Sequence, residues 1–317
     1  VNDEMISEFK HKGYLEPLEK NVMTEEVRDS FPQKYLESIC EENGHIYSVP
    51  FQMDIMMFWV NQELLKQAGL DEIKNTGDFD ILQKSLKNPD QYAYGDAWEN
   101  THVYNSLSQF VNFWGGDYFD WTDPKTKDAA RYMKSMLDEK NTSPAQFVDQ
   151  YEQMEEKFIR GKYGCVFMYT SALGTFLDAD VYGKNKIHMA PLPVLHKKKA
   201  TNIATWQYVL NNASENKDAA VRFLQYAAGY EGSTEYAKIM KSYPARVDVI
   251  ENEDIDLEGI DMIRKYLREY TLNARPLCEN SMGAVSDMGK LFQGYVLGQC
   301  EEDSFFEQAQ NCINTYY

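Results

Sequence analysis

The sequence predicts an α/β protein with mostly parallel sheets, divided into two lobes. Short apolar runs alternate with amphipathic segments along the chain, which is the pattern of strands connected by helices. The chain has 317 residues, of which 43% are hydrophobic, so it is long enough to build two cores of ordinary size. We therefore expect two domains.

The composition argues against several partners. Asp and Glu number 50 against 32 Lys and Arg, a net charge of −18, so nucleic acid and anionic membrane surfaces would repel the chain. The five cysteines form no CxxC pair and the five histidines no i, i+4 pair, so neither a metal site nor a cofactor is predicted. No run of 18 apolar residues predicts a membrane span, and the first residues show no signal-peptide pattern.

Residues 47–70 are the most informative stretch. They predict a strand that stops at Pro50, a second strand in the apolar run 55–60, and a helix that Asn61 caps and Gly69 ends. Between the two strands lie the polar residues Gln52 and Asp54. Such a pair either has a structural partner, as a turn aspartate does, or contacts a ligand.

Caps and apolar periodicity predict the other elements. The expected helices are 4–12, parts of 23–40, one after Thr76 or Asp78, one through Leu107 to Trp114, one after Asp123, one from Ser143 to Phe158, a short one around Leu173, 214–229, one after Gly232, 256–272, 285–297 and 304–316. The expected strands are 92–95, 164–169, 187–190 and 201–210.

No catalytic motif is present. The sequence lacks a GxSxG elbow and a glycine-rich phosphate loop after a strand, so it does not predict an enzyme. Instead, aromatic and polar residues adjoin at the junctions of elements, which suits a polar, ring-shaped ligand. The candidate ligand-binding residues are Gln52, Asp54, Trp98, Tyr169, Ser171, Trp206, Gln207 and Arg275. Each also has a structural interpretation.

Seven segments, in order, resemble the extracellular solute-binding protein family 1, the maltose-binding-like receptors of ABC importers. Residues 12–18 are similar to the family's KGxLxPL, and residues 47–70 to its GxPYxxDxxxLYYNKDLFxKAGL. Residues 158–162 resemble FxxGK, and residues 214–223 the helix SxNKxAAxxF. The others are 115–116, 190–193 and 243–246. The resemblance covers essentially the whole chain.

The resemblance implies a two-lobed periplasmic-binding-protein-like fold with a hinge of several crossovers. Lobe one would comprise residues 1–53 and 207–277, and lobe two residues 55–204 and 280–317. It also implies that a strand, a helix and a second strand precede Val1, and that lobe one would expose part of its hydrophobic core without them. A signal peptide and a lipid-bearing cysteine would likewise precede Val1.

The implied function is that of a non-catalytic substrate-binding component of an ABC importer, extracellular or periplasmic, lipid-anchored and monomeric, with permease subunits as partners. Its solute would be a carbohydrate captured between the lobes. The family's tryptophan in a GPWA-type turn is replaced by Tyr169 to Ala172, and an aromatic residue near the third crossover by Ser281 to Gly283. These departures favour a mono- or short oligosaccharide over a long maltodextrin, with Trp98, Trp114 or Trp206 as stacking platforms.

Two alternatives stay open. The same fold binding a cationic or amine solute would use the acidity and aromatic content through cation–π contacts. An α/β enzyme acting on glycans would need Asp54 for turnover.

Overall fold

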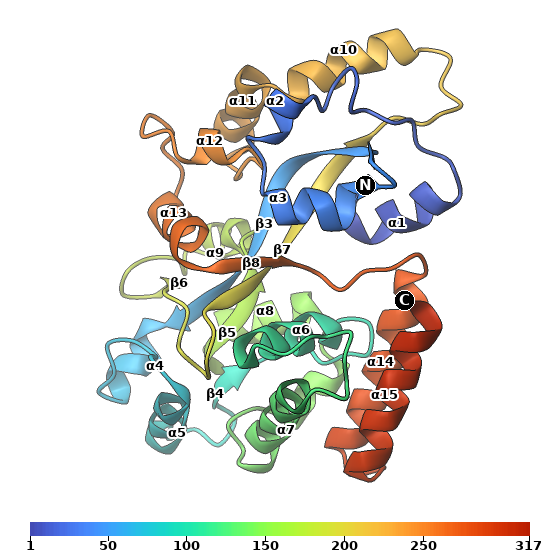
Figure 1. Cartoon of the computed structure of the whole chain (residues 1–317). Coiled ribbons are helices and arrows are strands. Elements are labelled where there is room, and N and C mark those ends of the chain that lie inside the picture. Colours follow the sequence, from blue (N-terminus) through green and yellow to red (C-terminus); the bar gives the residue numbers. More distant parts are fainter. The chain divides into compact units, whose positions relative to one another are not determined.

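A computed structural model describes all 317 residues, and the chain forms two compact units (Figure 1). Unit 1 comprises Val1–Ile55 and Ile203–Ser281, and unit 2 comprises Met56–Asn202 and Met282–Tyr317. The chain therefore passes between the units three times, within a few residues of the predicted lobe boundaries. Helices and strands alternate in both units, which confirms the predicted α/β class.

Strand β3 (Ser48–Asn61) belongs to both units. Its first part pairs antiparallel with β7 (Ala200–Val209), from Ser48 opposite Val209 to Ile55 opposite Ile203. The pairing register shifts between Pro50 and Gln52. The predicted strand end at Pro50 is therefore wrong: the irregularity accommodates the proline within one continuous strand.

In unit 2, β3 pairs antiparallel with β5 (Tyr163–Tyr169) and β6 (Ile187–Ala190), whereas β4 (Tyr92–Gly95) runs parallel to β5. The sheet order is β4-β5-β3-β7-β8, with β6 beside β3. The sheet is thus mixed, and the expectation of parallel pairing does not hold for β3. The reason is topological: β3 leads the chain out of unit 1 and β7 leads it back, so the two strands run in opposite directions.

Unit 1 contains most of the short elements. Its helices are α1 (Asp3–His11), α2 (Glu25–Arg28), α3 (Gln33–Tyr35), the π-helix η1 (Leu36–Cys40), α10 (Lys217–Ala228), α11 (Tyr230–Met240), α12 (Val247–Ile250) and α13 (Ile260–Glu269). The two-residue strands β1 (Glu41–Glu42) and β2 (His45–Ile46) pair with each other, and β8 (Thr271–Ala274) lies beside β7. The predicted helix 256–272 thus begins later and gives way to β8, because Tyr270 is already extended.

Unit 2 contains the three longest helices, α7 (Pro124–Asp138), α14 (Ser281–Val296, whose first residue lies in unit 1) and α15 (Glu302–Tyr316), together with shorter ones. The shorter ones are α4 (Gln62–Gln67), α5 (Thr76–Ser85), α6 (Val103–Trp114), the 3-10 helix η2 (Pro144–Val148), α8 (Tyr151–Ile159) and α9 (Ala172–Asp178). Asn61 and Asp123 cap α4 and α7 as predicted, whereas Asn75 caps α5. The single helix expected from Ser143 to Phe158 is divided into η2 and α8, because Asp149 and Gln150 are extended.

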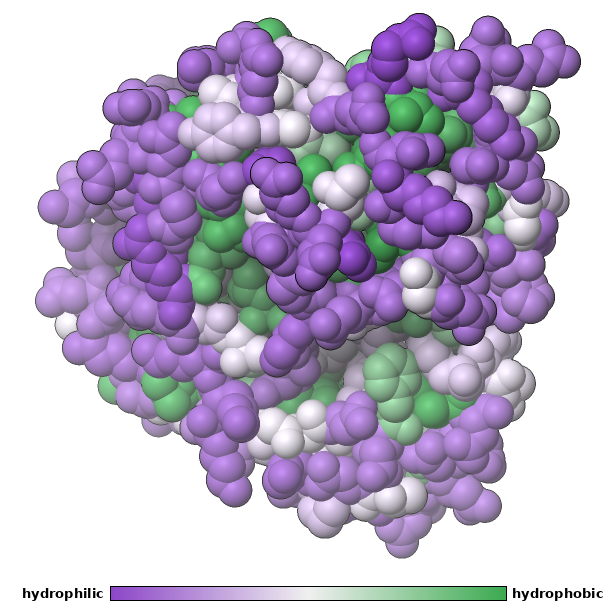
Figure 2. All heavy atoms as spheres, turned by 45° about the horizontal axis from the view of Figure 1, so that its top comes forward, coloured by the Kyte–Doolittle hydropathy of each residue, from purple (hydrophilic) through white to green (hydrophobic).

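The core of unit 2 is aromatic. Phe58 on β3 and Phe113 on α6 pack against Phe167 on β5, with ring centroids 4.9 and 5.4 Å apart. On the face drawn in Figure 2 hydrophilic side chains predominate and apolar ones form separate patches. In unit 1, α10 and α11 carry several large side chains that are about half exposed or more: Phe223, Tyr226, Tyr230, Ile239 and Met240.

No disulfide links the five cysteines. Cys40, Cys165, Cys278 and Cys312 are buried, and Cys300 is partly exposed. Burial raises the pKa of Cys40 to about 12 and that of Cys165 well above its usual value, so neither thiol ionises near neutral pH. No helix has both the length and the apolar character needed to cross a membrane.

Candidate functional site

Three predicted residues share one face of the β3–β7 pair in unit 1. Gln52 lies opposite Trp206, and Asp54 lies opposite Ala204. Because side chains alternate along a strand, Gln52 and Asp54 point to the same face, and directly paired residues join them there. Trp206 is 47% exposed, Gln52 is partly exposed and Asp54 is 8% exposed. The structure therefore brings an amide, a carboxylate and an accessible indole ring together.

Tyr236, on α11, joins this face, although no sequence pattern selects it. Its hydroxyl donates to Gln52 Oε1 over 2.8 Å. Burial raises the pKa of Tyr236 and the charge of Asp54 adds to this rise, whereas an interaction with Ser242 acts in the opposite direction. The tyrosine hydroxyl thus bonds to the amide and lies within the electrostatic influence of the carboxylate.

Gln207 faces the other way, into the core of unit 1. Its Oε1 accepts from Ser48 Oγ and, over 3.2 Å, from Cys40 Sγ. Its Nε2 donates to Tyr35 Oη over 2.9 Å, and the residue is 1% exposed. Gln207 follows Trp206 directly on β7, so its side chain points to the opposite face of the strand. It therefore has a structural role in the core of unit 1.

Arg275, just after β8, is held by acidic residues of α1. It forms an ion pair with the fully buried Asp3, and its Nη1 lies 2.8 Å from Glu4 Oε1. Burial lowers the pKa of Arg275 to about 9, which still leaves the guanidinium charged at pH 7. Asp3 also accepts from Tyr35 Oη over 3.3 Å. The ion pairs of Arg275 thus hold α1 in place within unit 1.

In unit 2, the predicted Tyr169 and Ser171 lie at the end of β5 and the start of α9. The Tyr169 hydroxyl donates to Asn105 Oδ1 over 3.0 Å, and its ring contacts Tyr151 edge to face, with centroids 5.9 Å apart. Ser171 is exposed. The structure brings these two residues close to each other.

A second aromatic and polar group adjoins Tyr169, and sequence analysis did not select it. Tyr151 packs edge to face on His102, with centroids 5.4 Å apart, and His102 Nδ1 lies 3.1 Å from Glu99 Oε2. Burial would raise the pKa of Glu99, but hydrogen bonds from Thr101 and His102 outweigh it and lower the pKa. The helical spacing of Tyr151 and its neighbours indicated only a helix.

Trp98 is fully buried, so the prediction of an exposed stacking ring there is wrong. Its indole nitrogen donates to Asp96 Oδ2 over 2.8 Å, and its ring packs edge to face on Phe147 and Phe292. Trp114 is also buried, at 6% exposure, and stacks on His196. Both rings belong to the core of unit 2.

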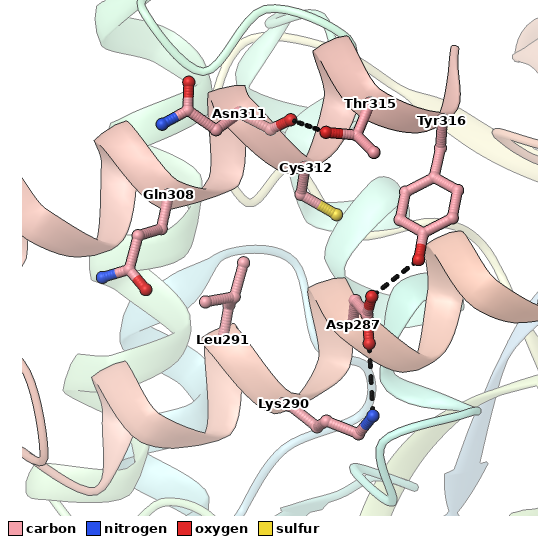
Figure 3. Close-up of a pocket in the computed structure, with 8 residues that line it drawn as sticks. All are labelled: Asp287, Lys290, Leu291, Gln308, Asn311, Cys312, Thr315 and Tyr316. Atoms are coloured by element: carbon pink, nitrogen blue, oxygen red, sulfur yellow. Dashed lines mark hydrogen bonds and ion pairs between the residues drawn. The ribbon is translucent and has the colours of Figure 1, made fainter.

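A cavity of about 470 Å³ lies between α14 and α15 and contains none of the predicted residues (Figure 3). Asp287 accepts from Tyr316 Oη over 2.7 Å and pairs with Lys290 at 3.2 Å. Gln308 and Thr315 hydrogen-bond along their own helix. Most of its polar side chains thus bond within the two helices, which makes this cavity a groove between α14 and α15. No group of His, Cys, Asp and Glu side chains in the protein is arranged to hold a metal ion.

Residues 2–234 match the family described as bacterial extracellular solute-binding protein. A probable amino-acid ABC transporter periplasmic-binding protein of Sinorhizobium fredii is 24% identical over 72% of the chain and 54% of its own length. The arabinooligosaccharide-binding protein of Bacillus subtilis is 23% identical over 74% of the chain and 56% of its own length. The chain thus spans about half the length of these curated relatives.

Solved structures show the same fold. An ABC transporter solute-binding protein from Thermotoga lettingae, crystallised with α-D-tagatose, has a TM-score of 0.84 at 17% identity. The match covers 99% of this chain and 83% of that one. The fold is therefore the two-lobed periplasmic-binding-protein fold that the sequence predicted.

Proposed function

Because the chain belongs to the bacterial extracellular solute-binding protein family, we propose that it is the non-catalytic substrate-binding component of an ABC importer for a mono- or short oligosaccharide. The observation that carries the proposal is the shared face of Gln52, Asp54 and Trp206. An amide and a carboxylate can hydrogen-bond to sugar hydroxyls, and an exposed indole can cover the apolar face of the ring. Tyr169 and Ser171 are the proposed contacts from unit 2.

The exposure of the tryptophans supports a small solute. Trp206 is 47% exposed, whereas the other four, Trp59, Trp98, Trp114 and Trp121, are 6% exposed or less. A long oligosaccharide needs a stacking ring for several of its sugar units. A single accessible indole suits one or two units.

The proposed setting follows from the family. The protein would act outside the cytoplasmic membrane, as a monomer held by a lipid anchor, and deliver its solute to the permease subunits of the importer. The relatives support the importer: one is named as an ABC transporter periplasmic-binding protein.

A panel of solutes tests the proposal by thermal unfolding of the full-length protein. Related solved structures contain α-D-tagatose, maltose, D-mannitol and ribitol, which form the panel. A bound solute at 100 times its Kd stabilises the folded state by about 2.7 kcal/mol. We expect at least one member to raise the Tm, and Trp206→Ala to reduce that shift. Tyr226→Phe, on the exposed face of α10, is the control and keeps the shift. No shift with any sugar or polyol, including arabino-oligosaccharides, would overturn the carbohydrate proposal.

An amine solute is the second candidate. It is favoured by the net charge of −18 and by the Sinorhizobium relative, whose name refers to amino acids. Stabilisation by spermidine or by amino acids, weakened by salt and absent with sugars, would select this candidate. A glycan-acting enzyme would instead require turnover of a glycoside that is lost in Asp54→Asn.

A further inference from the structure

Gln52 is hydrogen-bonded on one side of its amide only. Its Oε1 accepts the Tyr236 hydroxyl over 2.8 Å, and its Nε2 has no hydrogen-bond partner within the protein. The residue is partly exposed, so these two N–H groups are accessible to a solute. An amide side chain has an acceptor oxygen and a donor NH₂ group. Because Tyr236 bonds to the oxygen, the NH₂ group remains available to a solute.

The chemistry of the two bonded atoms sets the direction of the Tyr236–Gln52 hydrogen bond. The partner atom, Gln52 Oε1, is a carbonyl oxygen and can only accept, so the Tyr236 hydroxyl is the donor. The single hydroxyl proton of Tyr236 is used in this bond. The nearby charge of Asp54 also raises the pKa of Tyr236, which keeps the phenol protonated.

The ring of Tyr236 is itself positioned by packing. It contacts Phe51 edge to face, with centroids 5.5 Å apart, and Phe51 stacks on Tyr208 at 4.1 Å. Gln52 therefore meets a hydroxyl whose place is fixed by a neighbour on its own strand. An amide held in one orientation before the solute arrives loses little conformational entropy when the solute binds.

We infer that Tyr236 is a positioning residue that fixes the Gln52 amide with its N–H donors available to the solute, and so selects a neutral polyhydroxy compound over an amine at this position. A hydroxyl oxygen accepts from Nε2, whereas an ammonium group has only donors and cannot form a hydrogen bond with Nε2. The Asp54 carboxylate on the same face can accept from hydroxyl and ammonium groups alike, so the discrimination rests on the Gln52 donors. The selectivity for a polyhydroxy solute rests on the proposed function, whereas the positioning of the Gln52 amide by Tyr236 does not.

The first test observes the amide itself. In the free protein, side-chain ¹⁵N relaxation of Gln52, assigned by the loss of its NH₂ signals in Gln52→Glu, is expected to report an ordered amide. Tyr236→Phe should make this amide mobile, and Tyr226→Phe, which removes a hydroxyl from an exposed tyrosine of α10, should leave it ordered. An amide that is equally ordered in Tyr236→Phe overturns the inference.

The second test measures selectivity by calorimetry with D-mannitol, D-tagatose, ribitol, maltose and spermidine. For any polyol or sugar that binds, Tyr236→Phe should weaken binding about 3- to 10-fold, as the loss of one oriented hydrogen bond does. Gln52→Glu keeps an acceptor for Tyr236 but replaces the outward donor by an acceptor, so it should lower polyol affinity and raise spermidine affinity. Unchanged relative affinities in Gln52→Glu would overturn the assigned selectivity.

The two proposals fail differently. If no sugar or polyol binds but Tyr236→Phe mobilises the amide, the carbohydrate function is wrong and the positioning role stands. If sugars bind and the amide is unaffected, the function stands and the role of Tyr236 is wrong.

Discussion

Trp98 donates its indole N–H to Oδ2 of Asp96 over 2.8 Å inside the core of unit 2. The same carboxylate accepts from the Tyr94 hydroxyl over 2.7 Å, from Ser106 Oγ over 2.6 Å and from the Ala97 amide over 2.8 Å. Asp96 is fully buried. One carboxylate thus satisfies four donors that would otherwise be buried without partners.

Asp96→Asn should destabilise the protein by about 1–3 kcal/mol, because the new NH₂ group faces two donors in place of an acceptor. Urea unfolding at pH 7 measures the change. Asp178→Asn, at an exposed position at the end of α9, is the control and should change the free energy of unfolding by less than about 0.5 kcal/mol. Equal effects of the two substitutions would contradict the structural role of the buried carboxylate.

The stability that Asp96 contributes should depend on pH. Burial raises the pKa of Asp96 above its usual value of 3.8, although its hydrogen bonds act in the opposite direction. The folded state therefore binds the proton more tightly than the unfolded state. The part of the stability that comes from binding this proton is fully present below pH 3.8 and is lost as the pH rises through the raised pKa, whereas the four hydrogen bonds to the carboxylate remain at pH 7. Urea unfolding between pH 3.5 and 8 should show wild type losing stability relative to Asp96→Asn in that window. A relative gain with rising pH would mean that the pKa is lowered.

Trp98→Ala and Trp206→Ala should differ strongly in stability. Truncating the buried Trp98 removes a hydrogen bond and its contacts with Phe147 and Phe292, at a cost of about 3–5 kcal/mol. Trp206 is 47% exposed, so its truncation should cost less than about 1 kcal/mol. Chemical denaturation of both variants decides the matter, and similar losses would refute the distinction between a core ring and an accessible one.

Arg275→Met should cost about 3–5 kcal/mol, because it leaves the buried carboxylate of Asp3 without its cation. Adding Asp3→Asn to this variant should restore part of the loss. The matched control is Lys290→Met, which breaks an exposed ion pair with Asp287 and should cost less than about 1 kcal/mol. Additive losses in the Asp3 and Arg275 double variant would show that the two residues do not interact.

Two glycines of α14 should respond to alanine in opposite ways. A Cβ at Gly289 would collide with the backbone of Asn100, so Gly289→Ala should destabilise by about 1–3 kcal/mol. At Gly294 the nearest atom, Gln299 Oε1, is 3.9 Å away, so Gly294→Ala should stabilise the helix by about 0.4–1 kcal/mol. Thermal unfolding of the two variants measures both changes. A stable Gly289→Ala variant would mean that α14 does not approach Asn100 this closely.

Much of the fold was predictable because local chemistry determines it. Asn61 caps α4, Gly69 has a φ of 72° after it, and Asp123 with Pro124 begins α7, as the sequence predicts. Strand β8 was missed, because no change in the pattern of apolar and polar residues separates its four residues from the preceding helix. The continuity of β3 through Pro50 was missed because it depends on pairing with β7, more than 140 residues away in the chain.

The candidate site was predictable only in part. Gln52, Asp54 and Trp206 lie together, and strand alternation alone separates Gln207 from Trp206. The burial of Trp98 depends on Phe292, on a helix distant in the sequence, so no local pattern shows it. Tyr236 likewise contributes only through the packing of α11 on β3, which the spacing of its helix does not reveal.

The absence of disulfides has a practical consequence. Four of the five thiols are buried, and Cys300, in the turn between α14 and α15, is the partly exposed one. A maleimide dye added to the native protein should therefore attach at a single place without any engineered cysteine. That natural attachment point would let spectroscopic probes follow unit 2 while solutes are added.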